Sequence, residues 1–443
     1  MKIQLSDHFT YGRLLRFTLP SIIMMIITSI YSIVDGLFVS NLVGELALSA
    51  VNIVFPITMI IGSFGFMLGT GGSAVVARTL GEGKEELANR YFSMIITVVV
   101  LLGAFLTVLS VIFVEPLVRL AGASDLLMED SIVYGRIMLA GSVAFMLQTT
   151  FQSFFVVAEK PHMGLALTIA AGVTNMVLDY VFIKVMEMGI AGAGLATIIG
   201  YAVGGMIPLV YFICKKDNGI RLVRPKFYGN ILLKSCTNGS SEMMNTIASS
   251  VISMLYNIQL MKVLGESGVA AYSVMMYVDF IFLGAFLGFS MGSAPVVSYH
   301  FGADNREELK NIFKKSMYII GCASVAMVII AELLSKPLSA IFVGYNGELM
   351  KMTVHGFRLF ALNYLICGVN VYASAFFTAL SNGKISAFIS FMRSLILRGG
   401  MVLLLPLFWG VDGIWLAVVA AEGISVVISV AFLVAKRKQY HYV

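Results

Sequence analysis

The chain has 443 residues, of which 59% are hydrophobic and only 12% are charged, and its mean hydropathy is +0.91. A soluble globular chain is about half apolar and about a quarter charged, so this composition excludes a soluble protein of two or three domains. The net charge of +6 is modest and tail-weighted, which indicates membrane topology and not nucleic-acid binding. The four cysteines stand alone, without CxxC spacing, and predict neither a disulfide framework nor a metal site.

Apolar segments long enough to cross about 30 Å of hydrocarbon as helices recur along the whole chain. Such segments must be helical, because lipid offers no hydrogen-bond partner to open backbone, and the alternation typical of a transmembrane barrel is absent. The sequence therefore predicts an all-α polytopic membrane protein, and we expect no cleavable signal peptide, since no short apolar core with a cleavage site opens it. We place twelve spans at about residues 14–40, 47–77, 91–114, 132–157, 163–184, 190–213, 232–262, 269–300, 313–335, 353–380, 385–407 and 411–435.

Lysine and arginine are divided unevenly between the two sides of these spans. The odd-numbered loops hold only Arg119, Lys184, Lys262, Lys336 and Lys351, whereas the termini and the even-numbered loops hold a large excess of basic residues. Basic loops remain on the cytoplasmic side of a membrane. We therefore expect a multi-pass protein of the cytoplasmic membrane with both termini in the cytoplasm.

An offset of 221 residues brings the second half of the chain into register with the first. The matched pairs include Gly44 with Gly265, Gly71 with Gly292, Gly81 with Gly302, Pro116 with Pro337, Gly189 with Gly410 and Lys215 with Lys436. Chance would not keep one offset across six spans and also match the rarer proline and lysine. We predict two homologous six-helix lobes, residues 1–218 and 219–443, with a cytoplasmic linker at about 214–230. Because six is even, the pseudo-axis between the lobes lies along the membrane normal, and substrate binds between or within them.

Motifs for ATP hydrolysis and for metal or nucleophilic catalysis are missing from the sequence. Lys84 is followed by Glu85, and Lys384 by Ile385, where a Walker A loop requires Ser or Thr. The five histidines are dispersed and fit no metalloenzyme spacing. We expect a transporter and not an enzyme, without a cofactor. Its energy source is an ion gradient, and a substrate gradient or a separate ATPase subunit are the alternatives.

Polar residues in the predicted spans gather in the first half. Asp35 lies in span 1, Asn175 and Asp179 lie one helical turn apart in span 5, and Thr197 lies in span 6. An ionisable residue at this depth is costly and indicates a functional site. The 221-residue offset places non-ionisable residues at the equivalent positions of the second half, which are Tyr256, Ile396, Gly400 and Val418.

This asymmetry favours a functional role over a structural role, because a structural role would recur in both lobes. Two carboxylates, an amide oxygen and a hydroxyl are hard oxygen ligands that suit a small cation such as Na⁺. Two carboxylates in a pocket of low dielectric constant also resist joint ionisation, which makes a proton site. The alternative interpretation is hydrogen bonding between helices with one aspartate permanently protonated.

These residues and the two six-span halves resemble the multidrug and toxin extrusion (MATE) family over essentially the whole chain. In that family a proline bends span 1, and matching Asp, Asn, Asp and Thr residues form a proton or sodium site in the amino-terminal lobe. The resemblance implies these roles for Pro20, Asp35, Asn175, Asp179 and Thr197. It also implies a V-shaped pair of bundles that exports organic cations.

The second half departs from one branch of that family, which has a further cation site with acidic residues in spans 7 and 10. Glu242 matches the first of these, but span 10 contains no acidic residue. This argues against a second sodium site. Glu242 is then a candidate for recognition of substrate charge, or a partner of a basic residue.

Other polar and adaptable residues are candidates for the substrate cavity. Asp279 lines the cavity or pairs with Arg393 or Arg398, and we favour pairing; we also expect Glu422 to meet Arg398. Thioethers and aromatic rings suit flat aromatic cations. On this ground we assign to the cavity Met25, Phe151, Phe154, Met254 and Tyr277.

The combined prediction is a secondary active antiporter that exports organic cations or drugs across the cytoplasmic membrane in exchange for H⁺ or Na⁺. Its partners are lipophilic organic cations and the lipid bilayer, with no nucleic acid, and we expect a functional monomer. The alternative is a lipid-linked oligosaccharide flippase of the same superfamily. Such flippases commonly have extra spans or an arginine-rich cavity, whereas carboxylates predominate in the first lobe here.

Overall fold

The computed structural model describes residues 3–215, 219–343 and 347–443, and their regular structure is entirely helical. The helices of the first half are α1 (Tyr11–Leu42), α2 (Glu45–Gly81), α3 (Glu85–Ile112), α4 (Val114–Leu120), α5 (Asp125–Ala140), α6 (Ser142–Val157), α7 (Pro161–Asp179), the π-helix η1 (Tyr180–Val185) and α8 (Gly189–Cys214). Those of the second half are α9 (Gly229–Leu264), α10 (Glu266–Gly302), α11 (Arg306–Val343), α12 (Gly347–Ala361), α13 (Tyr364–Ala379), α14 (Gly383–Phe391), the π-helix η2 (Met392–Leu397), α15 (Arg398–Leu404) and α16 (Pro406–Tyr440).

Within the described residues, ten helices are long and apolar enough to cross a membrane, with helix and π-helix segments joined where they are continuous. Two helix pairs meet the same criterion together but are bent, α5 with α6 by 52° and α12 with α13 by 47°. With each pair counted as one span, the described chain contains the twelve predicted spans. The two bends lie near Gly141 and Leu362, which are separated by the repeat offset of 221 residues. The pattern of apolar residues gave no sign of either bend.

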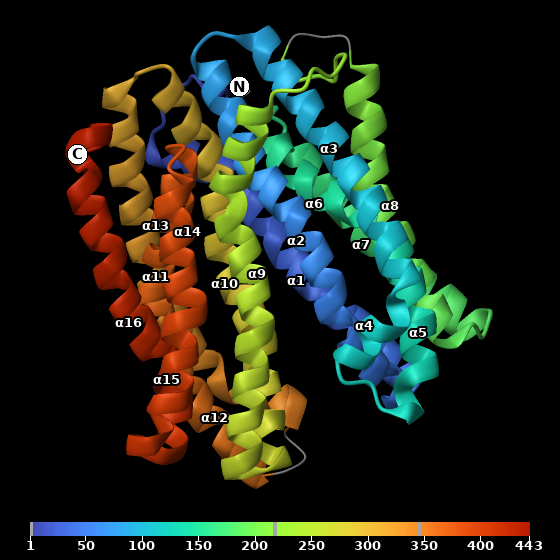
Figure 1. Cartoon of the computed structure of the whole chain (residues 1–443). Coiled ribbons are helices and arrows are strands. Elements are labelled where there is room, and N and C mark those ends of the chain that lie inside the picture. Colours follow the sequence, from blue (N-terminus) through green and yellow to red (C-terminus); the bar gives the residue numbers. More distant parts are fainter. Residues whose placement is uncertain (1–2, 216–218, 344–346) are drawn as a thin grey trace.

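The helices form two bundles arranged as a V (Figure 1). The first lobe contains α1 to α8 and the second contains α9 to α16. Both chain termini lie near the same side of the molecule, at the top of Figure 1, and we call this side the terminal face. The bundles meet toward the terminal face and diverge toward the opposite face. This confirms the V-shaped pair of bundles that the resemblance implied.

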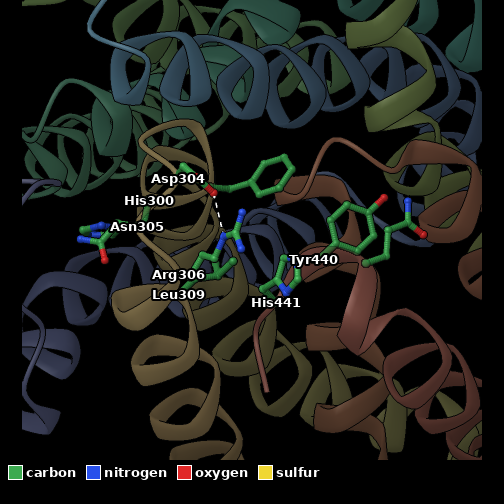
Figure 2. A pocket seen from close by; sticks show the side chains of 9 residues that line it. His300, Asp304, Asn305, Arg306, Leu309, Tyr440 and His441 are labelled. Atoms are coloured by element: carbon green, nitrogen blue, oxygen red, sulfur yellow. Dashed lines mark hydrogen bonds and ion pairs between the residues drawn. The ribbon is translucent and has the colours of Figure 1, made fainter.

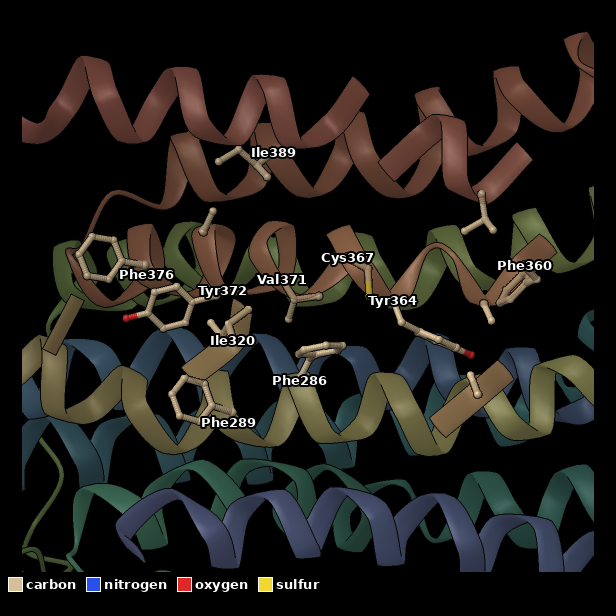
Figure 3. Packing of buried hydrophobic residues seen from close by; sticks show 14 of the residues in the cluster. Phe286, Phe289, Ile320, Phe360, Tyr364, Cys367, Val371, Tyr372, Phe376 and Ile389 are labelled. Carbon is tan, nitrogen blue, oxygen red and sulfur yellow. The ribbon is translucent and has the colours of Figure 1, made fainter. Parts of the chain in front are cut away.

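Buried apolar side chains form two cores. The first core draws mainly on α2, α3, α5, α6 and α8, and the second on α9 to α16. In the second core, Phe289 of α10 packs against Tyr372 of α13 with ring centroids 6.1 Å apart (Figure 3). Leu14 and Phe17, near the start of α1, belong to the second core, whereas Val39, near its end, belongs to the first. Helix α1 therefore contributes to the cores of both lobes.

Glycines allow α2 of the first lobe to cross α10 of the second near the terminal face. Gly81 of α2 lies against the carbonyl group of Tyr299, and Gly302 of α10 lies against the carbonyl group of Arg78. A Cβ at either glycine would collide with the backbone of the other helix. Gly81 and Gly302 are separated by 221 residues, and so are Arg78 and Tyr299. The two contacts are therefore symmetric counterparts, and the predicted pseudo-symmetry is present in the packing of the lobes.

Within the predicted linker at about 214–230, residues 219–228 lie along α3 without regular secondary structure. The backbone N–H of Arg221 donates to Asn89 Oδ1 at 3.0 Å, and that of Val223 donates to Ser93 Oγ at 2.8 Å. Residues 216–218, which include the predicted lobe boundary at 218, lie outside the described residues. That boundary stays a prediction.

Candidate functional site

The structure brings together the four polar residues that the sequence singled out in the first lobe. Asp35 comes from α1, Asn175 and Asp179 from α7, and Thr197 from α8. The Thr197 hydroxyl lies 3.4 Å from Asp35 Oδ1 and 3.0 Å from the carbonyl oxygen of Ala193, and it can donate to either. Asn175 Nδ2 donates to Thr197 Oγ1 at 3.4 Å. Three helices thus direct their polar side chains to one point inside the bundle.

Local backbone structure positions the α7 residues of this cluster. Asn175 and Asp179 are one turn apart and share a face of α7. The helix widens into the π-helix η1 immediately after Asp179, and π-helical segments are frequent at functional sites. Gly200 of α8 lies close to Ala171 and Asn175 of α7, with little space for a side chain. Because Gly200 has no side chain, α8 packs close enough to α7 for Thr197 to contact Asn175.

Buried oxygen atoms without partners dominate the cluster. Asp179 is fully buried and Asn175 is 2% exposed, while Asp35 is half-buried. Both carboxylate oxygens of Asp179 and the Oδ1 of Asn175 lack a hydrogen-bond partner among the described residues. No lysine or arginine of the described chain forms an ion pair with Asp35 or Asp179. Buried polar atoms in folded proteins nearly always have partners. These oxygens therefore fit a bound proton or a small hard cation, which would supply the missing positive charge.

Three tyrosines surround the cluster, and they were not identified as part of the site from the sequence. Tyr31, Tyr134 and Tyr201 are each less than 10% exposed and lie close enough to interact with the aspartates. The sequence spacing could have identified two of them, because Tyr31 precedes Asp35 by four residues and Tyr201 follows Thr197 by four. That spacing places each pair on one helix face.

Pro20 is buried within α1, which is assigned as one uninterrupted helix from Tyr11 to Leu42. Proline has no N–H and removes one backbone hydrogen bond from the helix interior. It lies between Phe17, which packs in the second core, and Asp35 in the polar cluster. The expected bend at Pro20 stays a prediction.

The residues assigned to the substrate cavity are placed in different surroundings. Met254 is 65% exposed and Tyr277 is 40% exposed, while Met25 and Glu242 are half-buried. Met25 lies on the side of α1 that faces α10, near Gly284. The structure does not gather these four residues into one described hollow.

Phe151 and Phe154 lie inside the first core. Both are completely buried, and both contact Phe92 and belong to an aromatic group that includes Phe212. The rings of Phe151 and Phe212 are stacked with centroids 5.6 Å apart. This position gives the two phenylalanines a packing role within the lobe.

The second lobe contains a buried network of paired charges. Arg393 Nε donates to both carboxylate oxygens of Glu422, at 2.9 and 3.0 Å, and Arg398 donates to one of them at 2.6 Å. Asn370 Nδ2 donates to the same carboxylate at 2.7 Å, and Ser429 in turn donates to Asn370 Oδ1 at 2.8 Å. Glu422 is fully buried. The expected contact between Glu422 and Arg398 is confirmed.

The pairing favoured for Asp279 is wrong. In the described chain Asp279 makes no ion pair with Arg393 or Arg398, although it lies close enough to Arg398 for their charges to interact. The physical reason is that Glu422 lies between the two guanidinium groups and accepts from both. Asp279 is 6% exposed, and its alternative assignment to the substrate cavity stays a prediction.

A hollow of 180 Å³ lies at the terminal face of the second lobe, away from the polar cluster (Figure 2). Arg306 pairs with Asp304 on one side of it at 3.0 Å, and Tyr440 and His441 lie on the other side. A second hollow, of 400 Å³, is lined by Leu5, by residues of the first lobe and the linker, and by Tyr299 of α10. Neither contains a residue that the sequence assigned to the ion site or the substrate cavity.

Comparisons with known proteins agree with the architecture. Residues 20–181 and 243–400 match the MatE family. The multidrug export protein MepA of Staphylococcus saprophyticus is 25% identical over 368 residues, 80% of each chain. The FAD transporter of Shewanella oneidensis is 24% identical over 339 residues, 74% of each chain.

Solved structures match the fold over almost the whole length. A crystal structure of a MATE protein in complex with MaL6 superposes with a TM-score of 0.92 at 20% identity, covering 98% of both chains. The outward-facing conformation of a multidrug resistance MATE transporter gives 0.91 at 20% identity, again over 98% of both chains. Because the family match covers well over half of the sequence, this chain belongs to the MatE family, the MATE multidrug export transporters, and is a multi-pass membrane protein.

Proposed function

We propose that this protein is a secondary active antiporter that exports lipophilic organic cations or drugs in exchange for H⁺ or Na⁺. The observation that carries the proposal is the pair Asp35 and Asp179. Neither carboxylate has a basic partner among the described residues, and both oxygens of the fully buried Asp179 lack any hydrogen-bond partner there. An unpaired carboxylate within the membrane is costly. Protonation or binding of Na⁺ removes that cost, and the ion therefore favours the conformation in which the cluster is assembled.

Helix α1 supplies a route from the ion site to the contact between the lobes. Asp35, near one end, belongs to the polar cluster, whereas Leu14 and Phe17, near the other end, are buried in the second core. Pro20 weakens the helix between these two attachments. When Asp35 is drawn toward α7 and α8 by a bound ion, α1 shifts relative to the second lobe. Antiport follows if the drug binds the other conformation more tightly.

The charge of the first lobe and the names of the relatives support a cationic substrate. Unpaired carboxylates attract cations, and two relatives are named for multidrug export. Met25, Met254 and Tyr277 would supply adaptable apolar surface, and Asp279 and Glu242 would supply negative charge. We assign these five residues to the substrate cavity and leave Phe151 and Phe154 to the core.

The membrane setting completes the proposal. We infer that the terminal face lies in the cytoplasm, because the predicted cytoplasmic loops hold the excess of lysine and arginine. The bundles then open away from the cytoplasm in the described conformation (Figure 1). We further propose that the lobes divide near residue 218, that one chain suffices for transport, and that no cofactor beyond the coupling ion is needed.

Purified protein in liposomes tests this function directly. With a pH gradient and a Na⁺ gradient imposed separately, one of the two should drive accumulation of a cationic dye, and the other should have little effect. Movement of dye that ignores both gradients would refute antiport. Movement of a fluorescent lipid-linked sugar between leaflets, with no dye transport, would favour the flippase alternative.

A further inference from the structure

Residues 3–10 lie across the terminal face ahead of α1, and we call them the strap. Two apolar side chains hold the strap in place, Leu5 at 2% exposure and Phe9 at 0%. The Phe9 ring packs edge-on against Phe17 of α1 and His300 of α10, with ring centroids 5.8 and 6.4 Å apart. The strap is therefore packed into the protein and does not trail from it.

One end of the strap is attached to the first lobe. The backbone N–H of Leu5 donates to Glu159 Oε1 at 2.8 Å. Glu159 lies in the turn between α6 and α7 and has a positive φ of 56°. Leu5 and Glu159 also line the 400 Å³ hollow, which Tyr299 of the second lobe borders.

The other end of the strap is attached to the second lobe through Glu308, in the first turn of α11. Glu308 Oε1 accepts from the backbone N–H of Phe9 at 2.8 Å, and its Oε2 lies 2.6 Å from His8 Nδ1. The carbonyl oxygen of Phe9 accepts from Asn311 Nδ2 at 2.9 Å and from Lys315 Nζ at 2.6 Å. Both polar groups of the Phe9 backbone are thus bound by one face of α11.

Glu308 is held in position for this contact. Asn311 Nδ2 donates to Glu308 Oε1 at 2.7 Å, and Asn305 Oδ1 accepts from the Glu308 backbone N–H at 3.1 Å. The Glu308 side chain is only 8% exposed, whereas the neighbouring Glu307 is exposed. A buried carboxylate with fixed partners is a specific anchor and not a chance surface contact.

We propose that the strap is a latch that holds the two lobes together at the terminal face in this conformation and is released when they part. The proposal rests on the alternating access proposed above. Leu5 and Phe9 are four residues apart, and four residues of fully extended chain span at most about 14 Å. Whichever lobe α1 follows, separation of the lobes at this face must break the contact with Glu159 or the contact with Glu308. The latch therefore biases the transporter toward the conformation that is closed at the terminal face.

The test measures access to a residue sealed between the lobes. Ser235 of α9 is completely buried, and its carbonyl group lies against Gly71 of α2, so it is enclosed between the second lobe and the first. We would introduce Ser235→Cys into an otherwise cysteine-free chain, reconstitute the protein in lipid nanodiscs, and measure the rate of labelling by a maleimide without any ion gradient. Labelling requires that the lobes part at the terminal face.

Variants at both anchors are compared with a matched control. Glu308→Ala and Glu159→Ala should each raise the labelling rate by about tenfold, because hydrogen bonds to a charged group are lost. Glu307→Ala, in the same helical turn, should leave the rate within about twofold of the parent and so controls for the charge at the α11 terminus. A chain lacking residues 2–8 loses Leu5, and with it the attachment to Glu159, but keeps Phe9 and the start of α1. It should label at least as fast as Glu308→Ala.

Parent-like labelling of the chain that lacks residues 2–8 would overturn the latch, whether or not Glu308→Ala folds. Because labelling needs no gradient, the result is separate from the test of ion coupling. Faster labelling in the strap variants without ion-driven transport in the parent would support the latch and refute antiport. Ion-driven transport in the parent, with unchanged labelling in the strap variants, would support antiport and refute the latch.

Discussion

The two lobes share one helical scaffold but keep their buried charges in opposite states. In the first lobe, Asp35 and Asp179 face one another without a basic partner among the described residues. In the second lobe, Glu422 is fully buried and accepts from both Arg393 and Arg398. The carboxylates of the first lobe have no positively charged partner among the described residues, whereas the carboxylate of the second lobe is neutralised by arginines of the protein itself.

The difference assigns different roles to the two clusters. A carboxylate bound by two guanidinium groups and an amide is complete in the described conformation, and removal of it leaves two buried cations without a partner. Under the proposed function, the aspartates of the first lobe are complete only when a proton or a cation is bound. We therefore expect the second cluster to govern stability and the first to govern transport.

The largest expected effect on stability is at Glu422. Glu422→Ala should lower the free energy of unfolding by about 3–5 kcal/mol, because Arg393 and Arg398 would remain buried and unpaired. Thermal unfolding of the purified protein in detergent measures the change. Glu332→Ala removes a partly exposed partner of Arg358, at 3.5 Å, and should cost no more than about 1 kcal/mol. Equal effects of the two substitutions would remove the distinction between the lobes.

The next effect is expected at Pro20. Pro20→Ala restores the missing helical hydrogen bond and stiffens α1 between its two attachments. The variant should fold with parent-like thermal stability but lose roughly tenfold in ion-driven efflux, since α1 would transmit ion binding less well. Dye efflux from liposomes measures this loss. Unchanged efflux would show that flexibility of α1 at this residue is not part of coupling.

Smaller effects are expected from the neutral members of the first cluster. Asn175→Ala and Thr197→Ala should each reduce ion-driven efflux by about threefold to tenfold, because uncharged ligands contribute less than carboxylates to binding a cation. The apparent affinity for the coupling ion should fall in parallel. A loss as complete as that of an aspartate substitution would mean that these residues organise the bundle, in which case thermal stability would fall as well.

Sequence reasoning identified the scaffold because the membrane restricts it. Apolar length sets the spans, and one repeat offset predicts two equivalent lobes. The bends and the α2–α10 crossing came from the structure and obey the same offset. The offset also isolated Asp35, Asn175, Asp179 and Thr197 as residues of one half only. The structure then brought those four side chains together.

Other features depend on contacts that no local pattern encodes. Asp279 and Glu422 both carry a charge at a depth from which they could meet Arg398, and only the packing of α16 gives both arginines to Glu422. The attachment of the strap to Glu308 joins residues about 300 positions apart. Phe151 resembles a cavity residue in sequence, but its stacking on Phe212 places it in the core.

Ion-driven drug transport by Asp179→Asn in liposomes tests the central claim most directly. Asn has almost the same shape as Asp and carries no charge, so it removes ion binding while preserving the packing around a fully buried position. The account predicts that gradient-driven efflux falls by more than about a hundredfold while drug binding in detergent stays within about threefold, with the exposed Asp125→Asn as a parent-like control. Normal ion-driven transport by Asp179→Asn would contradict the account and leave the cluster with a structural role alone.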